Sequence, residues 1–217
     1  MLKAVIFDMD GVIIDSEPVH LKLEYEIYNE LGIDITREEH STFVGTTSHY
    51  MWDTLKKKYK LSQDLDYLVN HAREKYFNYL TSEDCEIDLV EGVRDFIREL
   101  HERGTKLAIA SSSPLNVIEA VVKIFKLEEY FEVLVTGDMV QKSKPEPDIF
   151  LCAAEKLGAA PNECAVVEDS HNGVKAAQKA GMKCIGYKNP SSGNQDISMA
   201  DLVVEAFSEV DVDRLFK

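Results

Sequence analysis

The sequence has little that would indicate a zinc site, a disulfide framework or a membrane span. Its 217 residues include four cysteines, which are widely spaced and form no C-x-x-C pair. Zinc ligands come at short fixed spacings, and disulfide frameworks are typical of much shorter secreted chains. No apolar stretch approaches the roughly 20 residues of a membrane span. The first residues lead directly into a strand-like run without a signal-peptide pattern, so we expect a cytoplasmic protein.

Basic residues are also scarce. Lys and Arg total 24 against 39 Asp and Glu, which gives a formal net charge of -15. This balance argues against electrostatic binding of nucleic acid or of an anionic membrane surface. It leaves a small anionic substrate open, because a few placed cations and a metal ion can reverse the local sign. No G-x-x-x-x-G-K-[ST] string occurs, so a P-loop is not expected. The sequence carries no signature of an oligomeric state.

Short apolar runs rich in β-branched residues alternate with longer segments of helical periodicity. Near-continuous apolarity is typical of strands that are covered on both faces, as in a parallel sheet. Helical segments between the runs end near Gly104, Gly158 and Gly181. This alternation predicts an α/β protein with a doubly wound parallel-sheet (Rossmann-like) core. The predicted strands are Ala4–Phe7, Leu107–Ala110, Val133–Val135, Ala165–Val167 and Cys184–Gly186.

One long interval contains no predicted strand. We expect Ser16 to cap a helix that begins at Glu17 and ends at Gly32. Further helices are predicted over about 38–43, 48–59 and 64–80. The sequence therefore predicts an inserted all-helical cap at residues 16–87, with residues 1–15 and 88–217 forming the core.

Polar residues follow the predicted strands directly. Ligands bind beyond the carboxyl ends of the strands in an open parallel sheet, so these residues should converge on one site. The candidates are Asp8, Asp10, Ser111, Ser112, Glu168 and Asp169, joined by Lys144 from the loop that precedes the predicted helix at Ile149. A hard divalent cation such as Mg²⁺ would offset the mutual repulsion of the acids. We therefore predict a Mg²⁺ site formed by Asp8, Asp10, Glu168 and Asp169.

The same residues predict a division of labour in phosphoryl transfer. Asp8 attacks phosphorus, while Mg²⁺ and Lys144 neutralise charge. Asp10 gives a proton to the leaving oxygen and later activates the water that cleaves the aspartyl-phosphate. Ser111, Ser112 and the amides of the turn before Pro114 are expected to bind the phosphate group.

These motifs resemble those of the haloacid dehalogenase-like superfamily in order and placement. They are Asp8-Met9-Asp10-Gly11-Val12, Ser111, Lys144-Pro145-Glu146-Pro147-Asp148 and Glu168-Asp169-Ser170. The helical insertion is similar to the cap of the phosphatase and beta-phosphoglucomutase branch. The resemblance implies phosphate-ester chemistry, because the superfamily's dehalogenases and phosphonatases lack an acid at the position of Asp10.

The resemblance leaves a phosphatase and a mutase to be distinguished. Asp15, Ser16 and His20 are similar to the segment that enters the mutase cap, which includes a histidine that helps control the general acid. The mutase carries a lysine just before a cap-loop glycine and an arginine three positions after it. Gly45 here follows Val44 and precedes Ser48 by three positions, so the cations that would hold a second phosphate are missing. We therefore favour a phosphatase for a small phosphorylated metabolite over a phosphosugar mutase.

Two cap features keep alternative interpretations. His20 either contributes to the substrate pocket or is a solvated helical histidine. Gly45 and Thr46 are predicted to line the pocket, although Thr46 or Thr47 is equally suited to cap a helix. A phospho-aspartate signalling receiver and a catalytically retired binding protein are weaker alternatives. The first lacks a large helical insertion, and the second need not retain every acid and the lysine.

Overall fold

The structure, a computed structural model, describes residues 2–215 and contains a six-stranded sheet with the strand order β3-β2-β1-β4-β5-β6. Every neighbouring pair is parallel. The strands are β1 (Ala4–Phe7), β2 (Lys106–Ser111), β3 (Val133–Thr136), β4 (Cys164–Glu168), β5 (Lys183–Tyr187) and β6 (Leu202–Val204). The predicted parallel α/β sheet is confirmed. The prediction missed β6, an edge strand in which Leu202 and Val203 are exposed.

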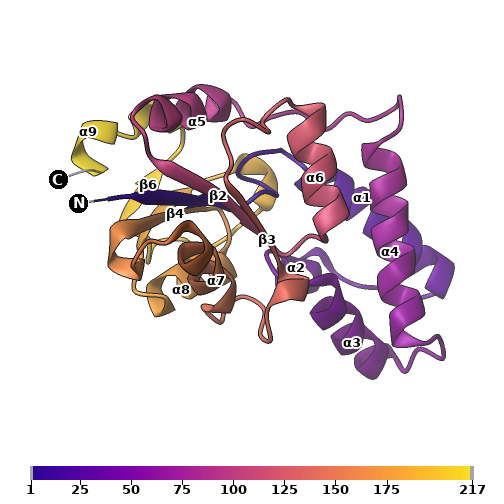
Figure 1. The fold of residues 1–217 in the computed structure, drawn as a ribbon. Coiled ribbons are helices and arrows are strands. Elements are labelled where there is room, and N and C mark those ends of the chain that lie inside the picture. The colour runs from indigo at the N-terminus through magenta and orange to yellow at the C-terminus, as the bar shows by residue number, and fades with distance from the viewer. Residues whose placement is uncertain (1, 216–217) are drawn as a thin grey trace.

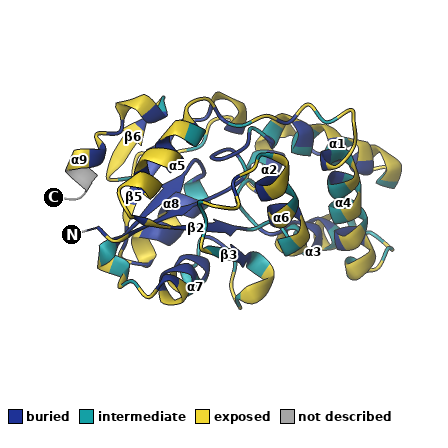
Figure 2. Cartoon of the chain, turned by 45° about the horizontal axis from the view of Figure 1, so that its top comes forward, coloured by how far each residue is buried: buried dark blue, intermediate teal, exposed yellow. Residues whose placement is uncertain are grey.

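Helices cover both faces of the sheet (Figure 1). Val5 and Phe7 of β1 pack with α5 (Val93–Glu102) and α6 (Leu115–Ile124). The alternate residues Ala4 and Ile6 pack with α7 (Asp148–Leu157) and α8 (His171–Lys179). Successive side chains of a strand point to opposite faces of the sheet, so the side chains on both faces of the central strands are buried. These strands are dark blue in Figure 2. The remaining short helices are η1 (Gly137–Met139), η2 (Pro161–Glu163), η3 (Pro190–Ser192), η4 (Phe207–Glu209) and α9 (Val212–Leu215).

An all-helical insertion lies between β1 and α5, as predicted. Its helices are α1 (Glu17–Leu31), α2 (Arg37–Ser41), α3 (Ser48–Tyr59) and α4 (Leu65–Leu80). In Figure 1, α1, α3 and α4 lie to the right of the sheet, with α4 beside α6. The insertion has an apolar core of its own, centred on the buried side chains of Tyr28, Trp52, Leu55 and Leu68. The insertion is therefore a second layer of structure next to the carboxyl ends of the strands.

The two segments that join the insertion to the sheet run side by side. Ile14 and Leu89 form an antiparallel bridge. The amide of Asp15 donates to the carbonyl of Asp88 at 2.9 Å, and the amide of Val90 donates to the carbonyl of Ile13 at 3.0 Å. The chain therefore leaves the sheet and returns to it at one place.

The start of α1 differs from its prediction. Ser16 occupies the position before the helix, but its hydroxyl makes no capping hydrogen bond and donates instead to Oδ1 of Asp10 at 2.6 Å. At the start of α3 the cap is Thr47, whose Oγ1 accepts from the amide of Tyr50 at 3.2 Å. Among residues 2–215, no helix has the length and apolarity needed to cross a membrane.

Candidate active site

The register of the sheet brings the predicted residues together. Phe7 pairs with Ile109 on one side and with Val167 on the other. Asp8 therefore emerges between the ends of β2 and β4, next to Ser111 and Glu168. A cavity of about 90 Å³ lies above this point. Its walls come from the ends of β1 and β2, from α1, and from the segment between α2 and α3. Gly45 and Thr46 line it from the cap.

Lys144 lies buried at the bottom of the site. Its Nζ donates to Oδ1 of Asp8 at 2.8 Å and to Oε1 of Glu168 at 2.6 Å, and the residue is 2% exposed. Burial opposes the charge of the lysine, but Asp8 and Glu168 outweigh it and raise its pKa above the usual range. The sequence placed Lys144 in this site, and the structure brings it to the two acids.

Asp8, Glu168 and Asp169 form a group of buried carboxylates. One oxygen from each lies within 4.8 Å of the others. Burial raises the pKa of Asp8 to about 8 even though Lys144 opposes the shift. Burial, reinforced by Glu168 and Asp8, also raises the pKa of Asp169 well above its ordinary value. One lysine thus leaves negative charge uncompensated. The ligand atoms that the three residues offer are all carboxylate oxygens, so the group fits a hard cation such as Mg²⁺.

The loop after β1 makes room for this group. Gly11 has φ +81°, and a Cβ atom at this position would lie 2.1 Å from Oδ2 of Asp169. Any larger residue would therefore displace the carboxylate. The same oxygen also accepts a hydrogen bond from Ser192, which holds it against the loop.

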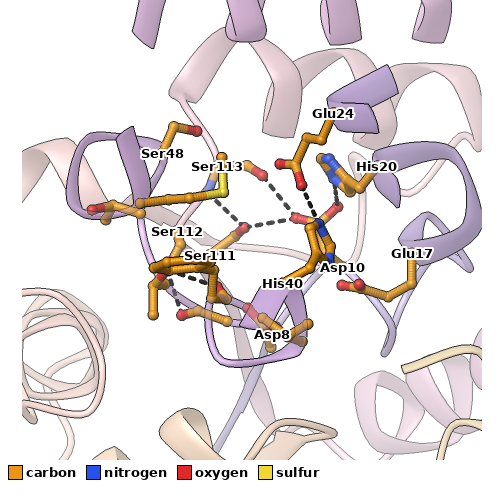
Figure 3. Close-up of a pocket in the computed structure, with 16 residues that line it drawn as sticks. Asp8, Asp10, Glu17, His20, Glu24, His40, Ser48, Ser111, Ser112 and Ser113 are labelled. Atoms are coloured by element: carbon orange, nitrogen blue, oxygen red, sulfur yellow. Dashed lines mark hydrogen bonds and ion pairs between the residues drawn. The ribbon is translucent and has the colours of Figure 1, made fainter. Parts of the chain in front are cut away.

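Asp10 lies apart from this group and is held by hydroxyls and a histidine (Figure 3). Its Oδ1 accepts from Ser16 at 2.6 Å and contacts Nε2 of His20 at 3.2 Å. Its Oδ2 accepts from Ser113 at 2.7 Å and from Ser111 at 3.3 Å. Burial opposes ionisation, but these hydrogen bonds and the charge of His20 lower the pKa of Asp10 to about 2.

His20 is the charged partner of Asp10. Burial lowers its pKa, but the hydrogen bond and charge of Asp10 prevail and raise it to about 9. Its ring also stacks on Tyr76, with the two centroids 4.0 Å apart. Of the two interpretations of His20, the structure therefore favours a residue in the pocket over a solvated one.

The other predicted phosphate-binding residues take different positions. Ser111 is 1% exposed and accepts a hydrogen bond from the amide of Ser113 at 3.0 Å. Ser112 donates across the cavity to the carbonyl of Gly45 at 3.1 Å. Thr46 lines the cavity, but its hydroxyl donates within the cap loop to Phe43 at 2.6 Å.

Glu17, Glu24, His40 and Ser113 also line the cavity and were not among the predicted site residues. Ser113 belongs to the serine run that follows β2, so the signal that found Ser111 applies to it as well. Glu17, His20 and Glu24 are spaced by three and four residues on α1, which places them on one helix face. This polar face of α1 could have been identified from the sequence spacing. His40 comes from α2, and its Nε2 lies 2.5 Å from Oε2 of Glu24.

Comparison with known proteins places the chain in a family. The model of the haloacid dehalogenase-like hydrolases matches residues 5–187. The chain is 33% identical to hexitol phosphatase B of Escherichia coli (strain K12), covering 95% of this chain and 93% of that protein. It is 28% identical to beta-phosphoglucomutase of Bacillus subtilis (strain 168), covering 99% and 94%. The structure superposes on CbbY from Rhodobacter sphaeroides, crystallised with phosphate, with a TM-score of 0.86, 28% identity and full coverage of both chains. As its four motifs predicted, the chain belongs to the haloacid dehalogenase-like hydrolase family.

Proposed function

We propose that the protein is a Mg²⁺-dependent phosphatase that hydrolyses a small, sugar-like phosphorylated metabolite through an aspartyl-phosphate on Asp8. The observation that carries the proposal is the placement of two acids in one cavity in opposite electrostatic settings. Asp8 is tied to the buried Lys144, and Asp10 is tied to hydroxyls and His20. Two carboxylates in such different environments are suited to separate roles. Phosphatases that act on sugars and hexitols are among the relatives of the chain, which supports the proposal.

In the first step, a carboxylate oxygen of Asp8 attacks phosphorus. The bond between phosphorus and the leaving oxygen breaks, its electron pair stays on that oxygen, and Asp10 supplies the proton. Lys144 holds Asp8 in place and offsets its charge. A bound Mg²⁺, held by Asp8, Glu168 and Asp169, would supply positive charge next to the phosphate oxygens. We leave the carboxylate of Asp10 out of this ligand set, because it lies outside the group.

The second step uses Asp10 in its ionised form. With its pKa lowered to about 2, Asp10 is ionised and can accept a proton from the water that attacks the aspartyl-phosphate. Phosphate leaves and Asp8 is restored. For the first step Asp10 must be protonated. An incoming phosphate group favours this because its charge repels the carboxylate and its oxygens accept hydrogen bonds from Ser111 and Ser113 in place of Asp10.

The cap must open to admit a substrate. The cavity of about 90 Å³ is small compared with the roughly 300 Å³ at which ligand pockets begin. Ser112, Asn172 and Gln195 of the core donate to the cap carbonyls of Gly45, Val44 and Ser41. Opening the cap would also separate His20 from Asp10 and Arg73 from Asp138. We propose that residues 16–87 move as the cap, with hinges near 14–16 and 87–91.

The test is phosphate release from a panel of phosphorylated metabolites with Mg²⁺ present. Asp8→Asn should abolish release and should prevent trapping of a phosphorylated protein in rapidly quenched samples. Asp95→Asn, which removes an exposed acid on α5, is the matched control and should turn over normally. Full activity of Asp8→Asn would contradict the mechanism.

A phosphosugar mutase is the second candidate. It is favoured by the similarity to beta-phosphoglucomutase along 99% of the chain and by the contact between His20 and Asp10. The cavity has no cation in the segment around Gly45 for a second phosphate. Incubation with beta-glucose 1-phosphate and a bisphosphate primer separates the candidates. A mutase produces glucose 6-phosphate with little free phosphate, whereas a phosphatase releases phosphate.

A further inference from the structure

The turn that follows β5 lies against the group of buried carboxylates formed by Asp8, Glu168 and Asp169. This turn, residues 189–192, brings a buried hydroxyl to the group. Ser192 is 4% exposed, and its Oγ donates a hydrogen bond to Oδ2 of Asp169. Ser192 therefore contacts a candidate metal ligand, although it takes no part in either chemical step proposed above.

The position of Ser192 is set by the hydrogen bonds of the turn. Oδ1 of Asn189 accepts from the amide of Ser191 at 2.7 Å, and the amide of Ser192 donates to the carbonyl of Asn189 at 3.3 Å. Asn189 is 6% exposed, and its Nδ2 donates to the carbonyl of Gly11 at 2.8 Å. The turn is thus tied to the loop after β1, and its hydroxyl reaches Asp169 from a fixed direction.

Gly11 confines the same carboxylate oxygen. A Cβ atom at Gly11 would lie 2.1 Å from Oδ2 of Asp169 and 3.0 Å from Oγ of Ser192. The loop after β1 therefore packs against both members of this hydrogen bond. As a result, Oδ2 is held by the protein itself.

The other oxygen of Asp169 is left for a ligand. Oδ1 of Asp169 accepts no hydrogen bond from residues 2–215. Asp8 shows the same arrangement, because Lys144 donates to its Oδ1 at 2.8 Å and its Oδ2 accepts no hydrogen bond within the described chain. Hydrogen bonds to a ligating carboxylate orient it toward the metal. Each aspartate is thus arranged to offer a cation one oxygen.

Ligation through one oxygen distinguishes Mg²⁺ from Ca²⁺. Mg²⁺ requires near-octahedral geometry at about 2.1 Å, which the close spacing of the two oxygens of one carboxylate would distort. Ca²⁺ takes roughly six to eight ligands at longer distances and accepts both oxygens of a carboxylate. An aspartate that offers a single oxygen denies Ca²⁺ this second contact.

We infer that Ser192 is a positioning residue that limits Asp169 to one metal-binding oxygen and thereby favours Mg²⁺ over Ca²⁺. The inference rests on the Mg²⁺ site of the proposed function and assigns part of its metal selectivity to the turn after β5. The hydroxyl acts on the metal only through Asp169.

Titration with the metal ions alone tests this role. We would measure the binding of Mg²⁺ and, separately, of Ca²⁺ to the metal-free native protein and to Ser192→Ala by calorimetry. Loss of a hydrogen bond to a metal ligand typically weakens metal binding about 10- to 100-fold, and we expect this loss for Mg²⁺. Ca²⁺ should lose less, because the second oxygen of Asp169 becomes available to it. The ratio of the Mg²⁺ to the Ca²⁺ association constant should therefore fall, by about tenfold.

Two further variants accompany this measurement. Ser198→Ala is the matched control, because the hydroxyl of Ser198 also donates to an aspartate, Oδ1 of Asp196 at 2.6 Å, but on the exposed surface. It should change neither association constant. Asn189→Ala releases the turn from the carbonyl of Gly11, and the ratio should fall in the same direction. This variant carries the test if Ser192→Ala does not fold.

An unchanged ratio would overturn the inference, because equal weakening of both metals would mean that the hydroxyl only stabilises the loop. Activity gives a second readout. The Mg²⁺ concentration for half-maximal phosphate release should rise in Ser192→Ala, while kcat at saturating Mg²⁺ is largely retained. A native protein that prefers Mg²⁺ but releases no phosphate from any substrate would refute the phosphatase and leave the role of Ser192 standing. Phosphate release with equal ratios in the native protein and Ser192→Ala would refute the role of Ser192 alone.

Discussion

Replacing Lys144 by methionine tests how far the native structure depends on one buried positive charge. Methionine keeps most of the length and apolar volume of the side chain but removes the ammonium group. Asp8 and Glu168, at 2.8 and 2.6 Å from Nζ, then lose their cation, and Asp169 lies in the same group. Removing one partner of a buried ion pair costs about 3–5 kcal/mol, because the remaining charge is left in an apolar setting.

This cost is large enough to measure by thermal unfolding. For a chain of this size each 1 kcal/mol shifts Tm by about 2–4 °C, so Lys144→Met should lower it by about 6–20 °C in the absence of divalent cations. The loss should shrink at acidic pH, because the carboxylates can then be protonated. Lys156→Met on the exposed side of α7 is the matched control and should change Tm little. An unchanged Tm for Lys144→Met would refute the view that the lysine compensates the buried acids.

Three further predictions concern the acids and the cap. The pKa of Asp8 is raised from 3.8 to about 8, so metal-free protein should lose stability as the pH rises from about 4 to 8; urea unfolding in EDTA should show this, and added Mg²⁺ should remove most of the loss. A urea midpoint of unfolding that rises with pH over this range would contradict this prediction for Asp8. Asp10→Asn should lower kcat about 10²- to 10⁴-fold in a phosphate-release assay, and retained activity would exclude Asp10 as the general acid. Trp52→Ala, in the core of the cap, should cost about 3–5 kcal/mol in chemical unfolding, whereas a smaller loss would mean that the cap core collapses around the gap.

The strands of the core were predictable because they are buried on both faces. That setting requires continuous apolar runs, and the runs at Ala4 and Cys164 stand out for this reason. β6 was not predictable in the same way, because an edge strand with exposed side chains needs no such run. The acids were found because parallel strands deliver their ends to one edge of the sheet, and Lys144 was found in the loop that precedes α7.

The parts that escaped prediction depend on contacts between segments far apart in the chain. Ser16 has the residue type and position of a helix cap, yet its hydroxyl binds Asp10 because the loop after β1 folds back on the helix start. His40 meets Glu24 only because α2 packs across α1. The local sequence pattern therefore identifies the candidate residues of each segment. Their hydrogen-bond partners depend on how the insertion packs over the sheet.

The adjacent hydrogen-bonded segments at 13–15 and 88–90 make the cap a module in the engineering sense. The two ends of the insert lie side by side, so a tight turn could join them if the insert were removed. Its length and internal fold can then vary without changing the register of any strand. The strand-end residues of the cavity are thereby separated in the chain from the cap residues that line it. A graft of another helical insert at these ends would carry its own selectivity onto the same chemistry.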